Sequence, residues 1–93
     1  MVAAGSVVKS IAGHDKDRFY VVLRTEGDFA YIADGKVRKL AAPKKKRLKH
    51  LRGTLAVIDP GTVLTDKQLR AALASVGGSA SQMLYEEGSE PIG

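Results

Sequence analysis

The chain has 93 residues, no cysteine, 44% hydrophobic residues and a formal net charge of +5. This length allows one small domain with a modest core, and the apolar content is that of a globular protein rather than a disordered chain. Without cysteine, disulfides, thiolate zinc sites and a thiol nucleophile are excluded. The first residues do not match a secretory signal, and no apolar run approaches the roughly 18 residues that span a bilayer. We therefore expect a soluble, cytoplasmic protein.

Basic residues are concentrated in residues 36–52, which contain nine of the fifteen Lys and Arg residues and no Asp or Glu. Like charges at this density repel one another, so the stretch favours a polyanionic partner. Nucleic acids fit, because each contact between a phosphate and a Lys or Arg side chain releases condensed counterions. A solvated charged loop without a partner is the alternative interpretation.

The first two thirds of the chain alternate short β-type segments with tight turns at residues 13–17 and 26–28. Pro43 cannot donate a backbone hydrogen bond and interrupts this pattern, so residues 44–47 are interpreted as a basic loop. Gly53 marks a bulge or bend within the last segment. Strands are expected at residues 6–12, 18–25, 29–33, 36–40 and 48–58.

Asp34-Gly35 lies between two of these segments and predicts a two-residue type I′ hairpin turn. The turn fixes the register, with the facing pairs Ala33 with Lys36, Ile32 with Val37, Tyr31 with Arg38 and Phe29 with Leu40. Arg38 then lies beside the ring of Tyr31. This pair is either a cation–π contact within the protein or a platform for an unstacked RNA base, and we favour the first.

After residues 59–61, which end the last strand, the periodicity changes to that of a helix. Thr65 and Gln68 occupy the positions of a capping box. The apolar face of this helix consists of Leu69, Ala72, Leu73 and Val76. Such a face packs against the strands or docks onto a partner. Gly77-Gly78 is expected to end the helix, and residues 79–93 are expected to form a flexible acidic tail.

These elements predict a mainly β protein, in which a small five-stranded barrel is followed by one C-terminal helix. The alternating pattern and the glycines exclude a helical bundle, and the lack of crossover helices excludes a parallel α/β sheet. We divide the chain into a barrel at residues 1–58, a linker and amphipathic helix at residues 59–78, and the tail at residues 79–93.

Three groups of residues occur in a characteristic order. They are Gly5-x-Val7-Val8-x-Ser10-x-Ala12-Gly13-x-Asp15-Lys16, then Ala33-Asp34-Gly35-Lys36-x-Arg38-x-Leu40, then Pro43-Lys44 with Lys49-His50-Leu51. The first group resembles the KOW motif of ribosomal and transcription-elongation proteins. The combination, over residues 5–58, is similar to the branch that contains the fourteenth e-type large-subunit ribosomal protein and its shorter bacterial relatives.

The resemblance implies an SH3-like barrel that binds structured RNA, usually ribosomal RNA, with ribosomal proteins as further partners. The motif places the turn at Gly13 and nearby basic residues close to the RNA, and Gly13 and Lys16 match it. Asp17 departs from the motif, because the family usually has Gly there. If the turn requires a positive φ at this position, Asp costs roughly 1 kcal/mol more than Gly.

The residues expected to contact RNA are the basic side chains of these two regions. They are Lys16, Arg18, Lys36, Arg38, Lys39, Lys44, Lys45, Lys46, Arg47, Lys49, His50 and Arg52. Their density fits sequence-independent contacts to phosphates. The alternative for His50 is an ordinary surface residue. We interpret residues 14–17, which contain one His and two Asp, as turn chemistry rather than a metal site, and expect no cofactor and no catalytic set.

The sequence therefore predicts a non-enzymatic RNA-binding protein that is associated with the ribosome or with translation. The alternative is a protein-interaction barrel for acidic or proline-rich peptides, which requires an exposed aromatic groove. With two Phe, three Tyr and no Trp, the chain is poorly equipped for this role unless two or three rings lie side by side on the surface. Residues 43–47 also resemble a nuclear localisation signal, a pattern that any basic loop can produce.

Overall fold

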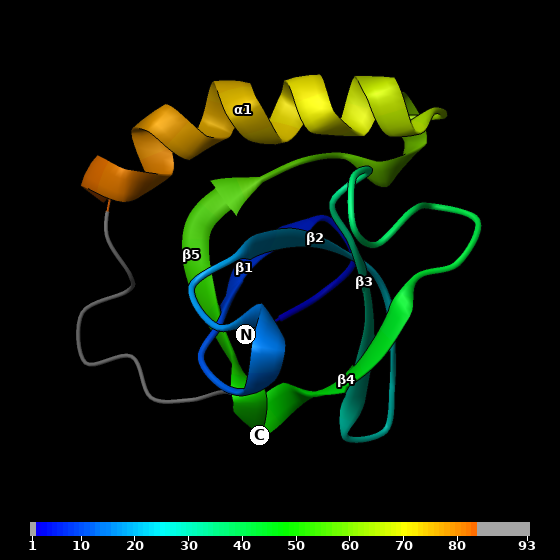
Figure 1. Cartoon of the computed structure of the whole chain (residues 1–93), viewed down its shortest axis with the longest axis vertical. Coiled ribbons are helices and arrows are strands. Elements are labelled where there is room, and N and C mark those ends of the chain that lie inside the picture. Colours follow the sequence, from blue (N-terminus) through cyan, green and yellow to red (C-terminus); the bar gives the residue numbers. More distant parts are fainter. Residues whose placement is uncertain (1, 84–93) are drawn as a thin grey trace.

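The structure, a computed structural model, describes residues 2–83, apart from the side chains of residues 15 and 77–83. Within this range the chain forms five strands and one α-helix (Figure 1). They are β1 (Ser6–Ser10), β2 (Phe19–Glu26), β3 (Phe29–Ala33), β4 (Lys44–Arg47), β5 (Leu51–Val57) and α1 (Asp66–Met83). The predicted mainly β fold with five strands and a C-terminal helix is confirmed. Residues 84–93 of the predicted tail lie outside the described residues.

The strands form one antiparallel sheet in the order β4-β3-β2-β1-β5. The chain crosses from one edge strand, β4, to the other, β5, through a single 3₁₀ turn, η2 (Leu48–His50). Such a connection reaches at most about 14 Å, whereas the edges of a flat five-stranded sheet lie about 19 Å apart. The sheet is therefore bent into an open barrel, and η2 joins its two edges at one corner (Figure 1).

Apolar side chains line both faces of this sheet. The cluster inside the barrel consists of Val8, Tyr20, Val22, Ala30, Ile32 and Leu51. The cluster on the outer face consists of Val7, Val21, Ala33, Ala56, Ile58, Val63 and Leu69. Successive residues of a strand point to opposite faces, so each pair of adjacent valines in β1 and β2 contributes one side chain to each cluster.

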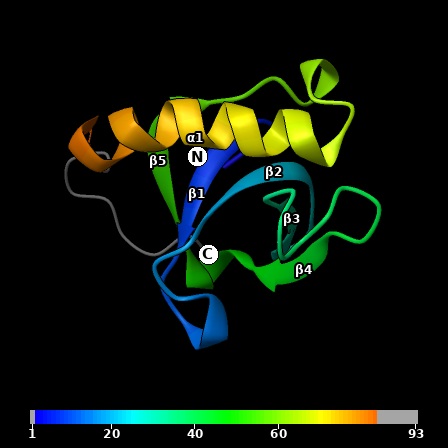
Figure 2. The ribbon, with the colours of Figure 1, turned by 45° about the horizontal axis from the view of Figure 1, so that its top comes forward.

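Helix α1 lies over the outer cluster and contacts β5 and β2 (Figure 2). Leu69 is completely buried, and Ala72, Leu73 and Val76 pack against the cluster, so the predicted apolar face packs against the strands.

The capping box at the start of α1 is confirmed. Thr65 Oγ1 accepts a hydrogen bond from Gln68 N at 3.1 Å, and Gln68 Oε1 accepts one from Thr65 N at 3.2 Å. The predicted end of the helix at Gly77-Gly78 is wrong, because α1 continues to Met83. Glycine lowers helix stability by about 1 kcal/mol relative to alanine, but it adopts helical φ and ψ without strain. Residues 79–83 contain no proline, so the helix can continue past the glycines.

The predicted strand after Asp34-Gly35 is wrong. Asp34 Oδ1 accepts hydrogen bonds from the backbone N–H groups of Lys36 at 2.9 Å and of Arg38 at 2.8 Å, which folds this segment into a loop. Gly35 has a positive φ of 77°, but it is buried against α1, where its carbonyl oxygen accepts from Arg70 Nη1 at 2.6 Å. An aspartate-centred turn that is fastened to the helix therefore replaces the hairpin.

Strand β4, which was expected to be a basic loop, is the actual partner of β3. The register is Phe29 with Arg47, Ala30 with Lys46, Tyr31 with Lys45 and Ile32 with Lys44. The predicted pairs Ala33 with Lys36, Ile32 with Val37, Tyr31 with Arg38 and Phe29 with Leu40 do not occur. Consecutive lysines have a low preference for strands, so the backbone ladder to β3 and the side-chain contacts on both faces hold β4 in place.

The last strand begins later than predicted, because residues 48–50 form η2. Val8 pairs with Gly53 and Ser6 pairs with Val57, so two steps along β1 face four steps along β5. The irregularity predicted at Gly53 is therefore confirmed. Thr54 Oγ1 donates to the carbonyl oxygen of Val7 at 2.7 Å and ties this part of β5 to β1.

Candidate nucleic-acid interface

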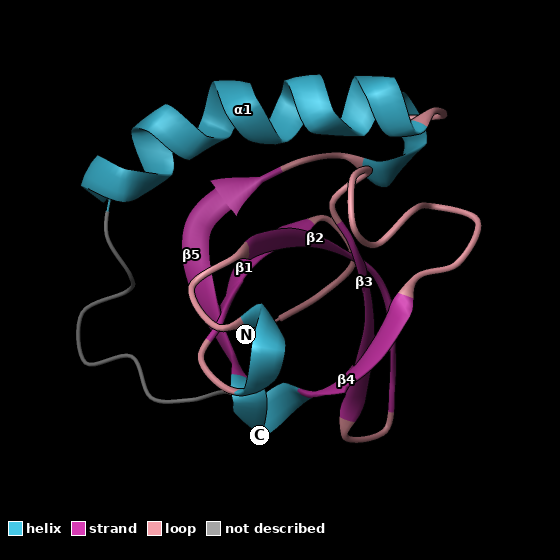
Figure 3. Ribbon diagram, viewed as in Figure 1, coloured by secondary structure: helices cyan, strands magenta, loops and turns pink. Residues whose placement is uncertain are grey.

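The basic candidate residues lie on two parts of the fold, the loop after β3 and the segments around β4 and η2 (Figure 3). The loop after β3, beside the start of α1, carries Lys36, Arg38 and Lys39. The larger group lies on β4, η2, the start of β5 and the turn between β1 and β2; it comprises Lys16, Arg18, Lys44, Lys45, Lys46, Arg47, Lys49, His50 and Arg52. The stretch 36–52 is therefore divided among a loop, β4, η2 and the start of β5.

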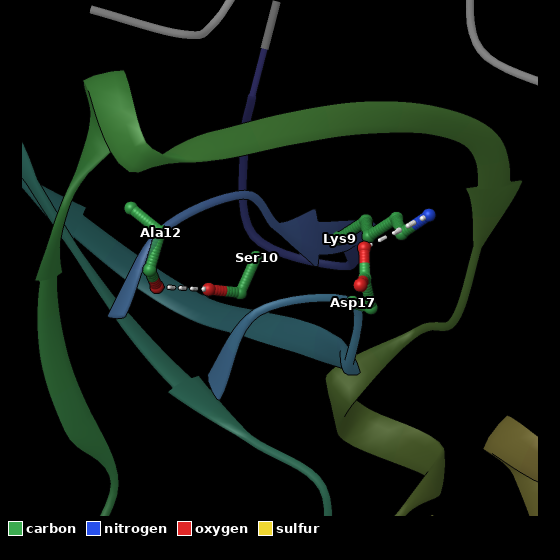
Figure 4. Close-up of polar contacts among 4 residues, drawn as sticks. All are labelled: Lys9, Ser10, Ala12 and Asp17. Carbon is green, nitrogen blue, oxygen red and sulfur yellow. Dashed lines mark hydrogen bonds and ion pairs between the residues drawn. The ribbon is translucent and has the colours of Figure 1, made fainter. Parts of the chain in front are cut away.

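The turn between β1 and β2 has a defined geometry. It contains the 3₁₀ segment η1 (Gly13–Asp15), and Gly13 and Asp17 have positive φ values of 78° and 72°. Asp17 thus adopts the left-handed conformation considered for it above, at a cost of roughly 1 kcal/mol relative to glycine. Its Oδ1 lies 3.5 Å from Lys9 Nζ, which links the end of the turn to β1 (Figure 4).

Lys46 supports this turn. It is 7% exposed, and its Nζ donates to the carbonyl oxygen of Ala12 at 2.9 Å. The same oxygen accepts from Ser10 Oγ at 3.1 Å (Figure 4). Because successive side chains of a strand alternate between faces, Lys45 and Arg47 point outwards from β4 while Lys46 points inwards. We therefore remove Lys46 from the candidate interface, which corrects the sequence-based set.

The outer face of β2, β3 and β4 carries two rows of facing side chains. The first row is Arg24, Tyr31 and Lys45, and the second is Glu26, Phe29 and Arg47. Arg24 reaches this face because the register between β2 and β3 shifts between Val22 and Arg24, so the alternation of β2 changes there. Arg24, Lys45 and Arg47 are exposed, and the two rings are half-buried.

Cations and rings alternate across this face. Arg24 Cζ lies 3.8 Å from the centroid of the Tyr31 ring, and Lys45 Nζ lies 5.9 Å from the same centroid. Lys45 Nζ and Arg47 Cζ lie 4.6 Å and 5.1 Å from the centroid of the Phe29 ring. We call these five residues the cation–aromatic ladder. Each contact of this kind contributes about 0.5–1 kcal/mol at an exposed site, so the cations are held only weakly over the rings.

Glu26 supplies a carboxylate to the same face. Its Oε1 lies 3.9 Å from Lys45 Nζ, and its Oε2 accepts from the hydroxyl of Tyr31 at 3.5 Å. Three cations and one carboxylate give the two rows a net charge of +2. An exposed ion pair contributes at most about 1 kcal/mol, so a phosphate can replace Glu26 as the partner of Lys45.

Further cations extend this surface beyond β4. Lys49 on η2 is exposed, as are Lys16 and Arg18 in the turn between β1 and β2. The turn and η2 are neighbours, because Ile11 N donates to the carbonyl oxygen of His50 at 2.9 Å. These cations therefore continue the positive surface from β4 around the end of the barrel opposite α1.

The loop after β3 carries the remaining basic candidates. It is fastened to the helix by Leu40 N, which donates to Asp66 Oδ1 at 2.8 Å, and by the contact between Arg70 and Gly35. Lys36 and Lys39 are exposed on it, and Arg38 is half-buried.

Sequence reasoning missed two residues of the ladder, Arg24 and Phe29. The position of Phe29 could have been found from the sequence, because Phe29 and Tyr31 are two residues apart in a strand and must share a face. The position of Arg24 has no signal in the sequence, since it depends on the irregularity in β2. The cation over Tyr31 is therefore Arg24 rather than the predicted Arg38.

No protein-family model matches the sequence, and no curated protein is significantly similar to it. Within residues 2–83, no three His, Asp or Glu residues lie together so that they could hold a metal ion. The described part of the chain also contains no helix that is both long and apolar enough to cross a bilayer. The functional interpretation therefore depends on the geometry of the basic surface and on the resemblance to the KOW motif.

Proposed function

We propose that this chain is a non-enzymatic RNA-binding protein of the KOW family that holds ribosomal RNA by its phosphate backbone. Strand β4 is the observation that supports RNA binding most directly. It consists entirely of cations, and two of them, Lys45 and Arg47, are exposed beside Arg24 on one face of the sheet. The resemblance of residues 5–58 supports ribosomal RNA as the target. It also supports ribosomal proteins as neighbours and a role in cytoplasmic translation.

The basic surface around β4 suits contacts that do not depend on base sequence. Its exposed cations are Lys16, Arg18, Arg24, Lys45, Arg47 and Lys49. Lysine binds a phosphate as a point charge, and arginine binds it through a planar fork. If about four to six of these side chains contact phosphates, a plot of log K against log salt concentration has a slope of roughly −3 to −5.

The proposal is tested by measuring affinity for a structured ribosomal RNA fragment over a range of salt concentrations. Replacing Lys45 and Arg47 together with alanine should weaken binding and reduce the slope by about 1.4–1.8, because two phosphate contacts are lost. Replacing Lys36 and Lys39, which are also expected to contact RNA, removes the same charge from the loop beside α1, and a smaller loss of affinity in this variant would place the main RNA contacts at β4. Equal binding by the Lys45/Arg47 variant and the parent at every salt concentration would contradict the proposal.

The choice of ribosomal RNA has its own test. Crosslinking in cells followed by sequencing of the attached RNA should return ribosomal RNA reads that cluster at one locus. Reads spread over many transcripts would retain RNA binding but contradict the assignment to the ribosome.

A second candidate function is the binding of acidic or proline-rich peptides. The observation that favours it is the pair of half-buried rings, Phe29 and Tyr31, which lie next to each other on the outer face of β3. Peptide-binding barrels use such rings as a groove. Titration with one proline-rich and one acidic peptide, with competition by RNA, distinguishes this function from the first.

A further inference from the structure

We infer that the cation–aromatic ladder binds unpaired nucleotides, with bases stacked on Phe29 and Tyr31 and phosphates held by Arg24, Lys45 and Arg47. This inference rests on the proposed function and specifies which part of an RNA the site takes. That part is a loop, a bulge or a single-stranded segment rather than a continuous duplex.

The two rings have the position that base stacking requires. Phe29 and Tyr31 are two residues apart on β3, so they point to the same side and lie about 6.6 Å apart along the strand. Both residues are half-buried, so they are not enclosed by the rest of the protein. Single-stranded nucleic acids bind to such rings with little dependence on sequence, because every base presents a π face.

The cations of the ladder can exchange an aromatic ring for a phosphate as their partner. In the protein alone, Arg24 lies over Tyr31 and Arg47 lies over Phe29, and Lys45 lies near both rings. When a nucleotide arrives, its phosphate offers each cation a stronger, charged partner, and the ring face that the cation covered becomes accessible to the base. A single strand carries bases and phosphates in alternation, as the ladder carries rings and cations.

Charge and shape favour a nucleic acid over a peptide on this face. An acidic peptide would pair with the cations but would leave the rings without a planar partner. A proline-rich peptide would use the rings, but it would have to displace the cations without offering them a negative charge. In a duplex, the bases are stacked on one another and inaccessible to the rings, so only the phosphate contacts would remain.

The test compares the full chain with variants in binding to a short single-stranded RNA and to the blunt duplex made from it. Replacing Phe29 and Tyr31 together with leucine should lower affinity for the single strand by at least about 30-fold, because two stacked bases are lost and each contributes about 5- to 150-fold. Affinity for the duplex should change by less than about twofold, and the salt dependence should stay unchanged because no cation is removed. Tyr31→Phe keeps the ring and serves as the matched control, with affinity expected within about twofold of the parent.

The outcomes separate this inference from the proposed function. If the double leucine variant binds the single strand as tightly as the parent does, the inference is wrong, while loss of binding in the Lys45/Arg47 variant would still support RNA binding. If a proline-rich or acidic peptide binds to the rings and single-stranded RNA does not, the ladder is a peptide site and the inference is overturned. If the parent binds neither RNA in dilute buffer, both proposals fail.

A second measurement covers the case in which the leucine variant does not fold. Ultraviolet crosslinking of the parent protein to the single strand, followed by mass spectrometry, should place the crosslink on Phe29 or Tyr31. Crosslinks that lie only at residues outside the outer face of β3 would contradict the inference.

Discussion

Replacing Lys46 with methionine should destabilise the protein without changing how its RNA affinity depends on salt. Replacing Lys45 with methionine should weaken the salt dependence of RNA affinity with little loss of stability. The two lysines are neighbours on β4, and methionine keeps much of the apolar stem while removing the charge. Lys46 is buried and donates to the carbonyl oxygen of Ala12 at 2.9 Å. Lys45 is exposed beside Glu26 and the two rings.

The loss of stability for Lys46→Met follows from this hydrogen bond. A hydrogen bond with a charged donor contributes about 1.5–3 kcal/mol. The acceptor oxygen keeps Ser10 Oγ at 3.1 Å, and methionine no longer requires the burial of an ammonium group. We therefore expect a loss of about 1–2 kcal/mol, which lowers Tm by about 4–16 °C in a domain of this size.

The effect of Lys45→Met should be on RNA binding. Its ion pair with Glu26, at 3.9 Å, is exposed and contributes at most about 1 kcal/mol of stability, and methionine keeps an apolar side chain with a polarizable sulfur beside the two rings that the lysine contacts. One lost phosphate contact should reduce the slope of log K against log salt by about 0.7–0.9.

Thermal unfolding followed by circular dichroism, together with RNA titrations at several salt concentrations, measures both quantities on the same two variants. A Lys46→Met protein with unchanged Tm would show that its hydrogen bond to Ala12 contributes nothing. A slope reduced as much in Lys46→Met as in Lys45→Met would show that Lys46 reaches the RNA, and the alternation of β4 would then be the wrong basis for choosing interface residues.

Two further substitutions test the contact between the loop after β3 and helix α1, and the cap at the start of this helix. Gly35→Ala should cost about 2–5 kcal/mol in denaturant unfolding, because the position has a φ of +77° and a Cβ there would overlap the backbone carbonyl oxygen of Asp66. Gly27→Ala, at a φ of +57° and with no atom within 4 Å of the added Cβ, should cost only about 1–2 kcal/mol; equal losses would contradict the close contact at Gly35. Thr65→Ala removes the cap that accepts from Gln68 N and should cost about 1 kcal/mol, with faster amide exchange in the first turn of α1. Unchanged exchange rates there would show that the cap is not needed.

The fold class, four of the five strands and the start of the helix were predictable because local signals agreed with the tertiary structure. Thr65 and Gln68 cap the helix as their spacing predicts, and Leu69 is buried at the first position of the apolar face. The error at Asp34-Gly35 arose because the same dipeptide suits two structures. What decided between them is the contact of Gly35 with α1, which lies more than thirty residues further along the chain.

The candidate site was predicted less completely. The excess of cations drew attention to residues 44–47, but composition could not show that they alternate between two faces or that Lys46 finds a backbone acceptor beside the turn between β1 and β2. The place of Arg24 beside Tyr31 depends on an irregularity within β2, for which the sequence has no glycine or other local marker. Both features are set by pairing between strands, which periodicity within one strand does not contain.

The presence of two apolar layers on one sheet has a consequence for how the protein can be shortened. A fragment ending after β5 would retain the interior packing but would leave Val7, Val21 and Ala33 facing water in place of α1. Contiguous apolar surface of this kind promotes self-association. A fragment that keeps the helix through Val76 retains this cover, and truncations that remove it should increase self-association.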